Sequence, residues 1–402
     1  MIERRRFLLA LWAWGFGPAL LGADRAGAPG ASLEPLAGAL VLSGGGARGA
    51  YEAGVVGGLA ARGGVRDGQR LPPYEVVCGT SIGALNGWFV ATGQYEKLRE
   101  LWYGISREKL IQAKSRYAAL RDSQSGLLDR AGSALSLIAL VRDQRGLLQS
   151  EPVRDWIARN VDPAVPLLVP LLWGVTNLAQ QRPEYFYVTP EGSGAELPRK
   201  VVNALHILLG PQTVVREATA DLLHDAIFAS SALPIAFDPV IMPGPDGVPA
   251  PYCDGGIATN SPVGVAHAVA TSADVVLLDP PFEAKTDYHD AVEIAFGAYG
   301  TMQRKIIEVE MRNAYFQSVG KRAIEGISPS EVSRVTRNNP LLATFMHSVT
   351  ATELRYIRPE QTLPLGVVGF NDEVGIGKAY RQGWEDVGSR GFVDYDWRTF
   401  QL

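Results

Sequence analysis

The chain has 402 residues, of which 47% are hydrophobic and 20% charged, so it is too apolar for an intrinsically disordered protein and long enough to bury a sizeable core. Its formal net charge of -4 argues against non-specific binding to nucleic acid, which relies on basic surfaces. The two cysteines, Cys78 and Cys253, are too few for a disulfide scaffold or a cysteine zinc cluster. Two small buried thiols are favoured over a disulfide between them.

Residues 1–28 are predicted to be a targeting segment rather than part of the fold. The segment Arg4-Arg5-Arg6-Phe7-Leu8-Leu9 is twin-arginine-like, and the apolar stretch at 7–21 is shorter than the roughly 20 residues that a transmembrane helix needs. Ala26-Gly27-Ala28 is similar to a cleavage signal. We therefore expect an exported protein, periplasmic or secreted. The alternative is a signal that stays uncleaved and retains the protein at a membrane.

Short apolar runs alternate with longer apolar stretches at helical spacing in the next part of the chain. The predicted order is a strand at 39–42, a helix at 49–61, a strand at 74–78 and a helix at 82–91. A repeated strand–turn–helix pattern is typical of a parallel sheet covered by helices. The sequence therefore predicts an α/β fold with a parallel-rich central sheet sandwiched by helices.

The pattern becomes mainly helical from 95 to 159 and mixed after that. Later strands are expected at 171–177, 185–189, 274–278 and 354–359, and later helices at 222–231, 297–322 and 378–389. A Leu-rich amphipathic stretch at 127–141 is predicted to be a core-facing helix, with a lid or lipid-contacting helix as the alternative. We find no clear linker, so we expect residues 281–402 to be a C-terminal extension packed on the domain formed by residues 38–280.

A Gly-x-Ser-x-Gly pattern is centred on Ser81, between a predicted strand and a predicted helix, which is the context of a nucleophile elbow. Gly79 and Gly83 permit a sharp turn without Cβ clashes, so the Ser81 hydroxyl would project from the end of the sheet. The N-terminus of the following helix would stabilise negative charge developing there. This pattern also occurs by chance, so it needs support from other segments.

Gly44, Gly45 and Gly46 also follow a predicted strand and precede a helix. Backbone N–H groups in such a turn can bind an oxyanion, and loss of one such donor typically costs about 2.7–4 kcal/mol. With Gly49, the segment also matches the Gly-x-Gly-x-x-Gly pattern of dinucleotide sites, which is the rival interpretation. The acidic residue that this motif requires about 20 positions later would be Asp67, which lies in a predicted turn rather than at the end of a second strand.

Asp254 precedes two glycines and is the candidate base for Ser81. A free carboxylate with a pKa of about 3.9 is a poor base for a serine hydroxyl, but a dry apolar site raises that pKa. A conventional Ser-His-Asp triad needs a histidine, and no histidine stands in a glycine-flanked loop after a strand. The five histidines are His206, His224, His267, His289 and His347. This favours a Ser-Asp dyad, with a conventional α/β-hydrolase as the alternative.

Three segments together resemble the patatin-like phospholipase family. They are Gly44-Gly45-Gly46-Ala47-Arg48-Gly49, Gly79-Thr80-Ser81-Ile82-Gly83-Ala84 and Asp254-Gly255-Gly256. Further support comes from Ala229-Ser230-Ser231-Ala232-Leu233-Pro234 and Asn260-Ser261-Pro262-Val263. The resemblance covers about residues 38–280, and residues 281–402 match more vaguely.

The resemblance implies that Ser81 is the nucleophile, that Asp254 accepts its proton without a histidine, and that the amides of Gly44 to Gly46 form the oxyanion hole. Arg48 would hold that loop or contact an anionic headgroup, with a surface ion pair as the alternative. The implied activity is hydrolysis of acyl esters in phospholipids or lysophospholipids, with transient contact to a membrane surface and without a metal or another cofactor. A non-catalytic lipid-binding protein on the same fold is the second hypothesis.

Overall fold

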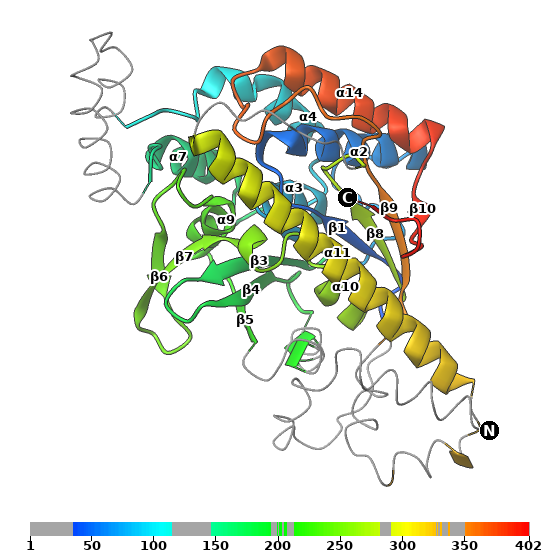
Figure 1. Ribbon diagram of the computed structural model, residues 1–402. Helices are drawn as coiled ribbons and strands as arrows, with labels where there is room; N and C mark the ends of the chain where they lie inside the picture. Colours follow the sequence, from blue (N-terminus) through cyan, green and yellow to red (C-terminus); the bar gives the residue numbers. More distant parts are fainter. Residues whose placement is uncertain are drawn as a thin grey trace.

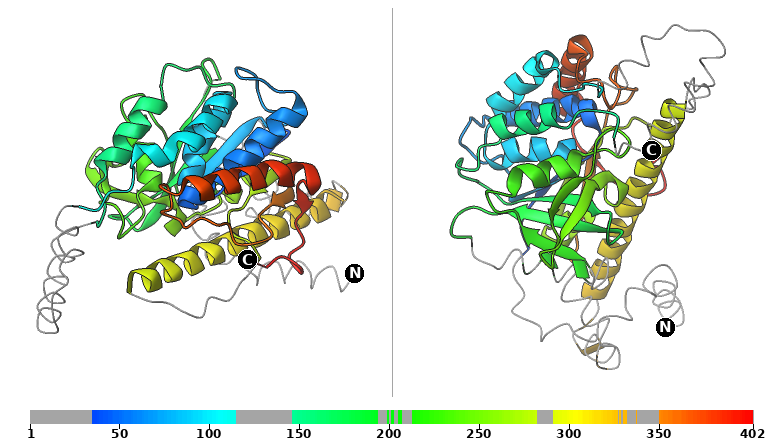
Figure 2. Two further views of the ribbon diagram at one scale, coloured as in Figure 1. Left: turned by 90° about the horizontal axis from the view of Figure 1, so that it is seen from above. Right: turned by 90° about the vertical axis from the view of Figure 1, so that its left-hand side faces the viewer.

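The computed structural model describes residues 35–114, 146–193, 213–281, 291–326 and 350–401, with a few single residues between these ranges. They form a mixed sheet, parallel at its centre, with helices packed on both faces (Figure 1, Figure 2). The α/β class predicted from the alternation of strands and helices is confirmed.

Within the described residues the sheet has ten strands in the order β10-β9-β8-β1-β2-β3-β4-β5, and β6 and β7 join it because β7 pairs with β3. The strands are β1 (Ala39–Leu42), β2 (Val76–Thr80), β3 (Leu171–Asn177), β4 (Arg182–Val188), β5 (Val214–Glu217), β6 (Val240–Pro243), β7 (Pro249–Asp254), β8 (Ser272–Val276), β9 (Glu353–Ile357) and β10 (Val393–Asp394). β1 lies at the centre, parallel to β2 on one side and to β8 on the other. All of β1 is buried, as expected for a strand covered on both faces.

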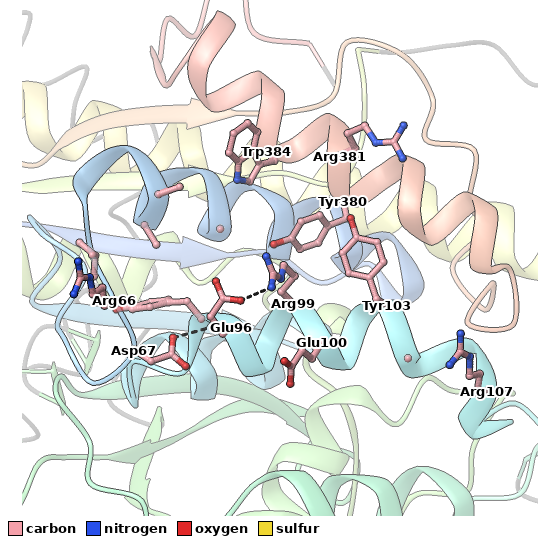
Figure 3. A pocket seen from close by; sticks show the side chains of 16 residues that line it. Arg66, Asp67, Glu96, Arg99, Glu100, Tyr103, Arg107, Tyr380, Arg381 and Trp384 are labelled. Atoms are coloured by element: carbon pink, nitrogen blue, oxygen red, sulfur yellow. Dashed lines mark hydrogen bonds and ion pairs between the residues drawn. The ribbon is translucent and has the colours of Figure 1, made fainter.

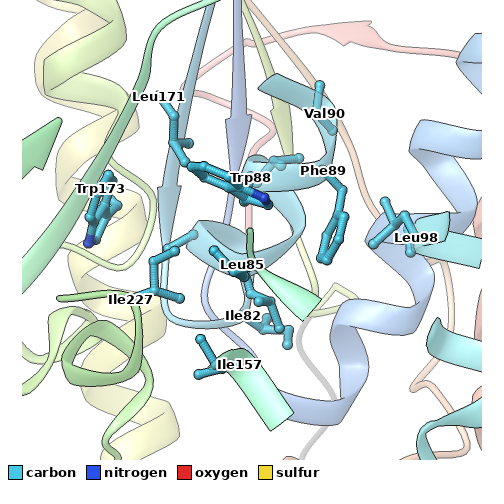
Figure 4. Packing of buried hydrophobic residues seen from close by; sticks show 14 of the residues in the cluster. Ile82, Leu85, Trp88, Phe89, Val90, Leu98, Ile157, Leu171, Trp173 and Ile227 are labelled. Carbon is cyan, nitrogen blue, oxygen red and sulfur yellow. The ribbon is translucent and has the colours of Figure 1, made fainter. Parts of the chain in front are cut away.

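Successive side chains of β1 contribute to two different hydrophobic clusters. Leu40 and Leu42 belong to the larger cluster, and Ala39 and Val41 to the smaller one. The larger cluster is formed with α2 (Gly49–Gly63), α3 (Ile82–Ala91), α4 (Tyr95–Gly104), α7 (Glu151–Asn160), α9 (Leu223–Ser231) and α14 (Glu373–Ser389). The smaller cluster is formed with α10 (Val263–Val269) and α11 (Ala291–Glu325). Figure 4 shows the apolar side chains of α3 inside the larger cluster.

The predicted elements lie close to the observed ones, with informative differences at their ends. The predicted strand at 39–42 and the predicted helix at 82–91 have the observed bounds. β4 begins at Arg182, three residues before the predicted start, because it pairs with the whole length of β3. The short strands β5, β6 and β10 were not predicted. The segments at 1–28 and 127–141 lie outside the described residues.

The chain beyond β8 is built into the same sheet and layers. β9 extends the sheet in parallel beside β8, and α14 packs along α2. α11 extends beyond its predicted ends and crosses the face of the smaller cluster (Figure 1). In the described ranges no helix combines the length and the apolar character needed to cross a membrane.

Candidate active site

Ser81 occupies the sharp turn between β2 and α3. Its backbone has φ 56° and ψ −124°, a conformation that costs a non-glycine residue of order 1–3 kcal/mol and persists only when its surroundings hold it. A Cβ atom at Gly79 would lie 2.4 Å from the carbonyl oxygen of Gly83, and one at Gly83 would lie 2.2 Å from that of Leu42. The two glycines therefore allow strand, turn and helix to approach closely, which is the geometry of a nucleophile elbow.

Ser230 of α9 anchors this turn to the sheet. The Ser81 amide donates to Ser230 Oγ at 2.8 Å, and the Ser230 hydroxyl donates to the Gly174 carbonyl of β3 at 2.6 Å. Ser230 is fully buried, so the chain of hydrogen bonds is shielded from water. The sequence placed Ser230 in a supporting motif but did not indicate this role, because the contact joins residues far apart in the chain.

The pairing of β3 brings Ser81 and Asp254 together. One edge of β3 pairs with β2 as far as Gly174, which is opposite Thr80, and then pairs with β7 from Val175, which is opposite Asp254. β2 and β7 thus end at consecutive positions along the same edge of β3. Ser81 follows β2 and Asp254 is the last residue of β7, so this pairing brings together two residues that are far apart in the sequence.

The Asp254 carboxylate lies in a dry environment, with 2% of the residue exposed. Burial raises the pKa of Asp254 to about 6, although hydrogen bonds from Ser81, from the Gly256 amide and from Tyr299 act to lower it. The Gly256 amide donates to Oδ1 at 2.6 Å. The sequence prediction of a carboxylate with an elevated pKa agrees with this environment.

Tyr299 of α11 is a residue that the sequence analysis missed. Its hydroxyl donates to Asp254 Oδ1 at 3.0 Å, and its side chain lines the same pocket as Ser81. No local pattern marks it, because it is one aromatic residue in a long helix. The only sequence signal is its position four residues before Gln303, on the stripe of α11 that continues through buried Ile307 and Met311.

The amides of the glycine loop before α2 differ in their hydrogen bonding. The Gly44 amide already donates to the Asn260 carbonyl at 2.9 Å. Gly45 and Gly46 line the pocket with Ser81, and their amides donate to no acceptor among the described residues. Gly46 has φ +59°, and a Cβ atom there would lie 2.1 Å from the Val367 carbonyl oxygen. Only glycine fits that position, because the backbone of Val367, in the C-terminal part of the chain, packs directly against it.

Arg48 is held by a buried carboxylate. Its Nη1 atom lies 2.5 Å from Asp279 Oδ1, and its Nε atom donates to the Gly45 carbonyl at 3.3 Å. Arg304 also pairs with Asp279, at 3.3 Å. Burial alone would raise the pKa of Asp279, but the two guanidinium groups hold it below its usual value. Arg48 thus contacts the glycine loop through the Gly45 carbonyl. The ion pair that holds Arg48 is less exposed than a surface pair.

A narrow apolar pocket opens beside Ser81 and Asp254. Its enclosed space is about 70 Å³, which is small compared with the roughly 300–1,000 Å³ of ordinary ligand sites. The apolar wall is formed by Ile82, Leu85, Ile105, Leu110, Ile111, Val153, Trp156, Ile157, Leu233, Phe237, Val367, Val368 and Phe370. Figure 4 shows Ile82, Leu85 and Ile157 facing one another at this wall. A wall of this composition favours contact with hydrocarbon groups over polar ones.

A larger groove lies between α2, α4 and α14 (Figure 3). Its charges are mixed, with Arg99 paired to Glu96 at 2.5 Å. Asp67 lines this groove just beyond the C-terminal end of α2, whereas the glycine loop precedes the N-terminal end. Fifteen helical residues, about 22 Å, separate the two ends. This separation disfavours the dinucleotide interpretation, because the acid and the glycines do not share a site.

The described histidines do not reach the pocket. His206 and His224 hydrogen bond to the carbonyls of Thr213 and Val161, and His267 is buried against Thr352. His289 and His347 lie outside the described residues. Both cysteines are buried and free, as the sequence favoured.

Comparison with known proteins identifies a family. A sequence profile described as patatin-like phospholipase matches residues 40–267, more than half of the chain. Among solved structures, the crystal structure of VipD from Legionella pneumophila is similar at 15% sequence identity with a TM-score of 0.33, over 91% of this chain and 69% of that one. No curated protein matches the sequence.

Proposed function

The chain belongs to the patatin-like phospholipase family, a family of lipid acyl hydrolases, and on that premise we propose that it cleaves lipid esters through a dyad of Ser81 and Asp254. The observation that carries the proposal is that both residues line the same apolar pocket, with Ser81 on a strained turn and Asp254 buried. Among the described residues, no histidine shares that pocket.

In the proposed reaction, Ser81 Oγ attacks the ester carbonyl carbon while its proton passes to the Asp254 carboxylate. The carbonyl oxygen becomes an oxyanion, which the amides of Gly45 and Gly46 would bind. Collapse of this intermediate breaks the ester C–O bond, and the alcohol leaves with the proton from Asp254. Water then attacks the carbonyl carbon of the acyl-enzyme and gives a proton to Asp254. Collapse of this second intermediate breaks the bond between Ser81 Oγ and the acyl carbon, releases the fatty acid, and returns the proton from Asp254 to Ser81 Oγ.

The wall of the pocket supports a lipid acyl chain as the substrate group. A phospholipid or lysophospholipid is the proposed substrate class, and the surface supports transient contact with a membrane. Ile235 is 50% exposed between the wall residues Leu233 and Phe237, and the wall residue Val368 is 39% exposed. Apolar residues that stay exposed beside a lipid-binding pocket can insert into the boundary of a lipid surface. The targeting pattern at 1–28 supports action outside the cytoplasm.

The test is hydrolysis of a panel of phospholipids, lysophospholipids, triacylglycerols and short p-nitrophenyl esters. We expect Ser81→Ala and Asp254→Asn each to lose activity by about 1,000-fold or more while melting like the wild type. Asp246→Asn is the matched control, because this exposed carboxylate lies in the turn between β6 and β7, away from the pocket. It should leave activity unchanged.

Labelling by a serine-directed fluorophosphonate separates an enzyme from a binding protein on the same fold. The labelled peptide should contain Ser81, and labelling should disappear in Ser81→Ala. A folded wild type that neither labels nor hydrolyses any ester would contradict the proposal and favour a lipid-binding role.

A further inference from the structure

The carboxylate of Asp254 is held from two sides at the same oxygen. The Gly256 amide and the Tyr299 hydroxyl both donate to Oδ1, at 2.6 Å and 3.0 Å. Gly256 is two residues away in the same turn, whereas Tyr299 comes from α11, beyond the residues matched by the family profile. Two donors on Oδ1 leave Oδ2 as the oxygen with free capacity to accept a proton.

We propose that Tyr299 is a positioning residue of this site, whose hydroxyl fixes the Asp254 carboxylate so that Oδ2 is the oxygen that receives the Ser81 proton. This inference rests on the proposed function and adds a residue to it. Tyr299 acts through Asp254 rather than on the substrate, and it stabilises the ionised carboxylate that the reaction needs.

The surroundings keep the Tyr299 hydroxyl a donor. Burial, together with the Asp254 charge, raises the pKa of Tyr299 well above its usual value, so the phenol stays protonated when Asp254 is ionised. Cys253 of β7 is a further titratable group beside Asp254, and burial raises the pKa of its thiol to about 12. Ser81, Tyr299 and Cys253 are thus all uncharged near neutral pH. Hydrogen bonds, rather than a neighbouring charge, stabilise the ionised carboxylate.

Other contacts made by α11 support the same role. Gln303, one turn along from Tyr299, donates from Nε2 to Asn260 Oδ1 at 3.1 Å, and Asn260 contacts the Gly44 carbonyl. Glu310 accepts from the Thr259 hydroxyl at 2.6 Å and from the Ser261 amide at 3.2 Å. One face of α11 therefore holds the whole segment that follows Asp254, with Tyr299 at the end nearest the pocket.

The test is the rate at which fluorophosphonate labels Ser81, measured between pH 5 and pH 9, because this readout needs no knowledge of the natural substrate. Tyr299→Phe removes only the donor. We expect labelling about tenfold slower at pH 7 and an acidic limb moved upward by roughly 0.5 to 1 pH unit, since the ionised carboxylate loses a charge-assisted hydrogen bond. Tyr315→Phe is the matched control on the same helix, about 24 Å further along, and its profile should match the wild type.

A double variant separates positioning from a general loss of structure. In the Asp254→Asn background, Tyr299→Phe should slow the residual labelling no further, because the ionised carboxylate that the Tyr299 hydroxyl stabilises is already absent. An acidic limb at the wild-type pH in Tyr299→Phe, or an equal loss in both backgrounds, would overturn the inference while leaving the dyad intact. If Ser81→Ala is labelled as fast as the wild type, the proposed function itself is overturned.

Discussion

The region matched by the family profile and the region that follows it contribute differently to the candidate site. Residues 40–267 contain the groups to which we assign the proposed chemistry, Ser81, Asp254 and the glycine loop. The later region provides contacts that hold those groups: Tyr299 on Asp254 and the Val367 carbonyl against Gly46. The comparison teaches that the candidate reacting groups and the contacts that hold them come from different parts of one fold. Variants on each side of this division therefore test different properties.

Among the contacts that hold the candidate site, the largest effect is expected where the two regions meet, at Gly46. Gly46→Ala puts a methyl group 2.1 Å from the Val367 carbonyl oxygen and forces alanine to φ +59°. We expect a loss of more than about 2 kcal/mol in the free energy of unfolding and at least about 100-fold in activity, because the Gly45 and Gly46 amides would shift. Urea unfolding and ester hydrolysis measure the two effects.

Gly64→Ala is the matched control for this variant. Gly64 has a similar φ, +64°, with no atom within 4 Å of an added Cβ. It isolates the cost of the backbone conformation, about 1 kcal/mol, and should leave activity unchanged. Equal effects of the two variants would mean that the contact with Val367 does not hold the loop.

A smaller effect is expected from Ser230→Ala, which acts inside the matched region. It leaves the buried Ser81 amide without its acceptor, so we expect a loss of about 1–3 kcal/mol in stability and a clear fall in kcat. Thermal melting and kinetics provide the measurements. Ser231→Ala, one residue along α9, removes only a 3.4 Å contact to the Ile227 carbonyl and should change stability by less than about 0.5 kcal/mol. Unchanged kcat in Ser230→Ala would show that the elbow holds its shape without this anchor.

A milder effect is expected from Gln303→Ala in the later region. It removes the hydrogen bond to Asn260 Oδ1 and should cost about 1 kcal/mol in stability, with a several-fold loss of activity. The neighbouring Met302 is 38% exposed, so Met302→Ala serves as the control in the same turn of helix. If both variants behave alike, the Gln303 contact has no role in holding the segment after Asp254.

A change of another kind, in the pH dependence of stability, is expected through Glu310. Burial raises the pKa of Glu310 to about 8 in the folded protein, against hydrogen bonds from Thr259 and Ser261 that lower it. The unfolded chain releases this proton near pH 4.3, so the folded state holds more protons between about pH 4.3 and 8, and stability falls as the pH rises through that window. Glu310→Gln should flatten this fall.

Urea unfolding of the wild type and of Glu310→Gln at pH 5 and pH 8 measures the difference. Glu308→Gln is the control, because Glu308 pairs with Lys305 at the surface. It should keep the wild-type fall. The buried Asp254, whose pKa is about 6, adds a fall at the acidic end of the window in all three proteins. A wild-type stability that rises from pH 5 to pH 8 would contradict the raised pKa of Glu310.

Local patterns were enough to predict the central elements of the fold. The apolar run of β1 and the helix that follows Ser81 were predicted with their observed bounds, because buried strands and helices have continuous apolar sequences. The edge strands β5 and β10 escaped prediction, since they are short, and part of their surface is exposed. Their pairing depends on neighbours that are distant in the chain rather than on their own residues.

The sequence by itself determined the nucleophile elbow and a carboxylate candidate, because glycine spacing around Ser81 and after Asp254 is a local property of the backbone. Only the tertiary structure decided that β2 and β7 end side by side on β3, that Gly44 has no free amide, and that Tyr299 donates to Asp254. These contacts join residues between 45 and 216 positions apart. Hydrogen bonds over such distances depend on how the layers pack, which no local pattern of residues records.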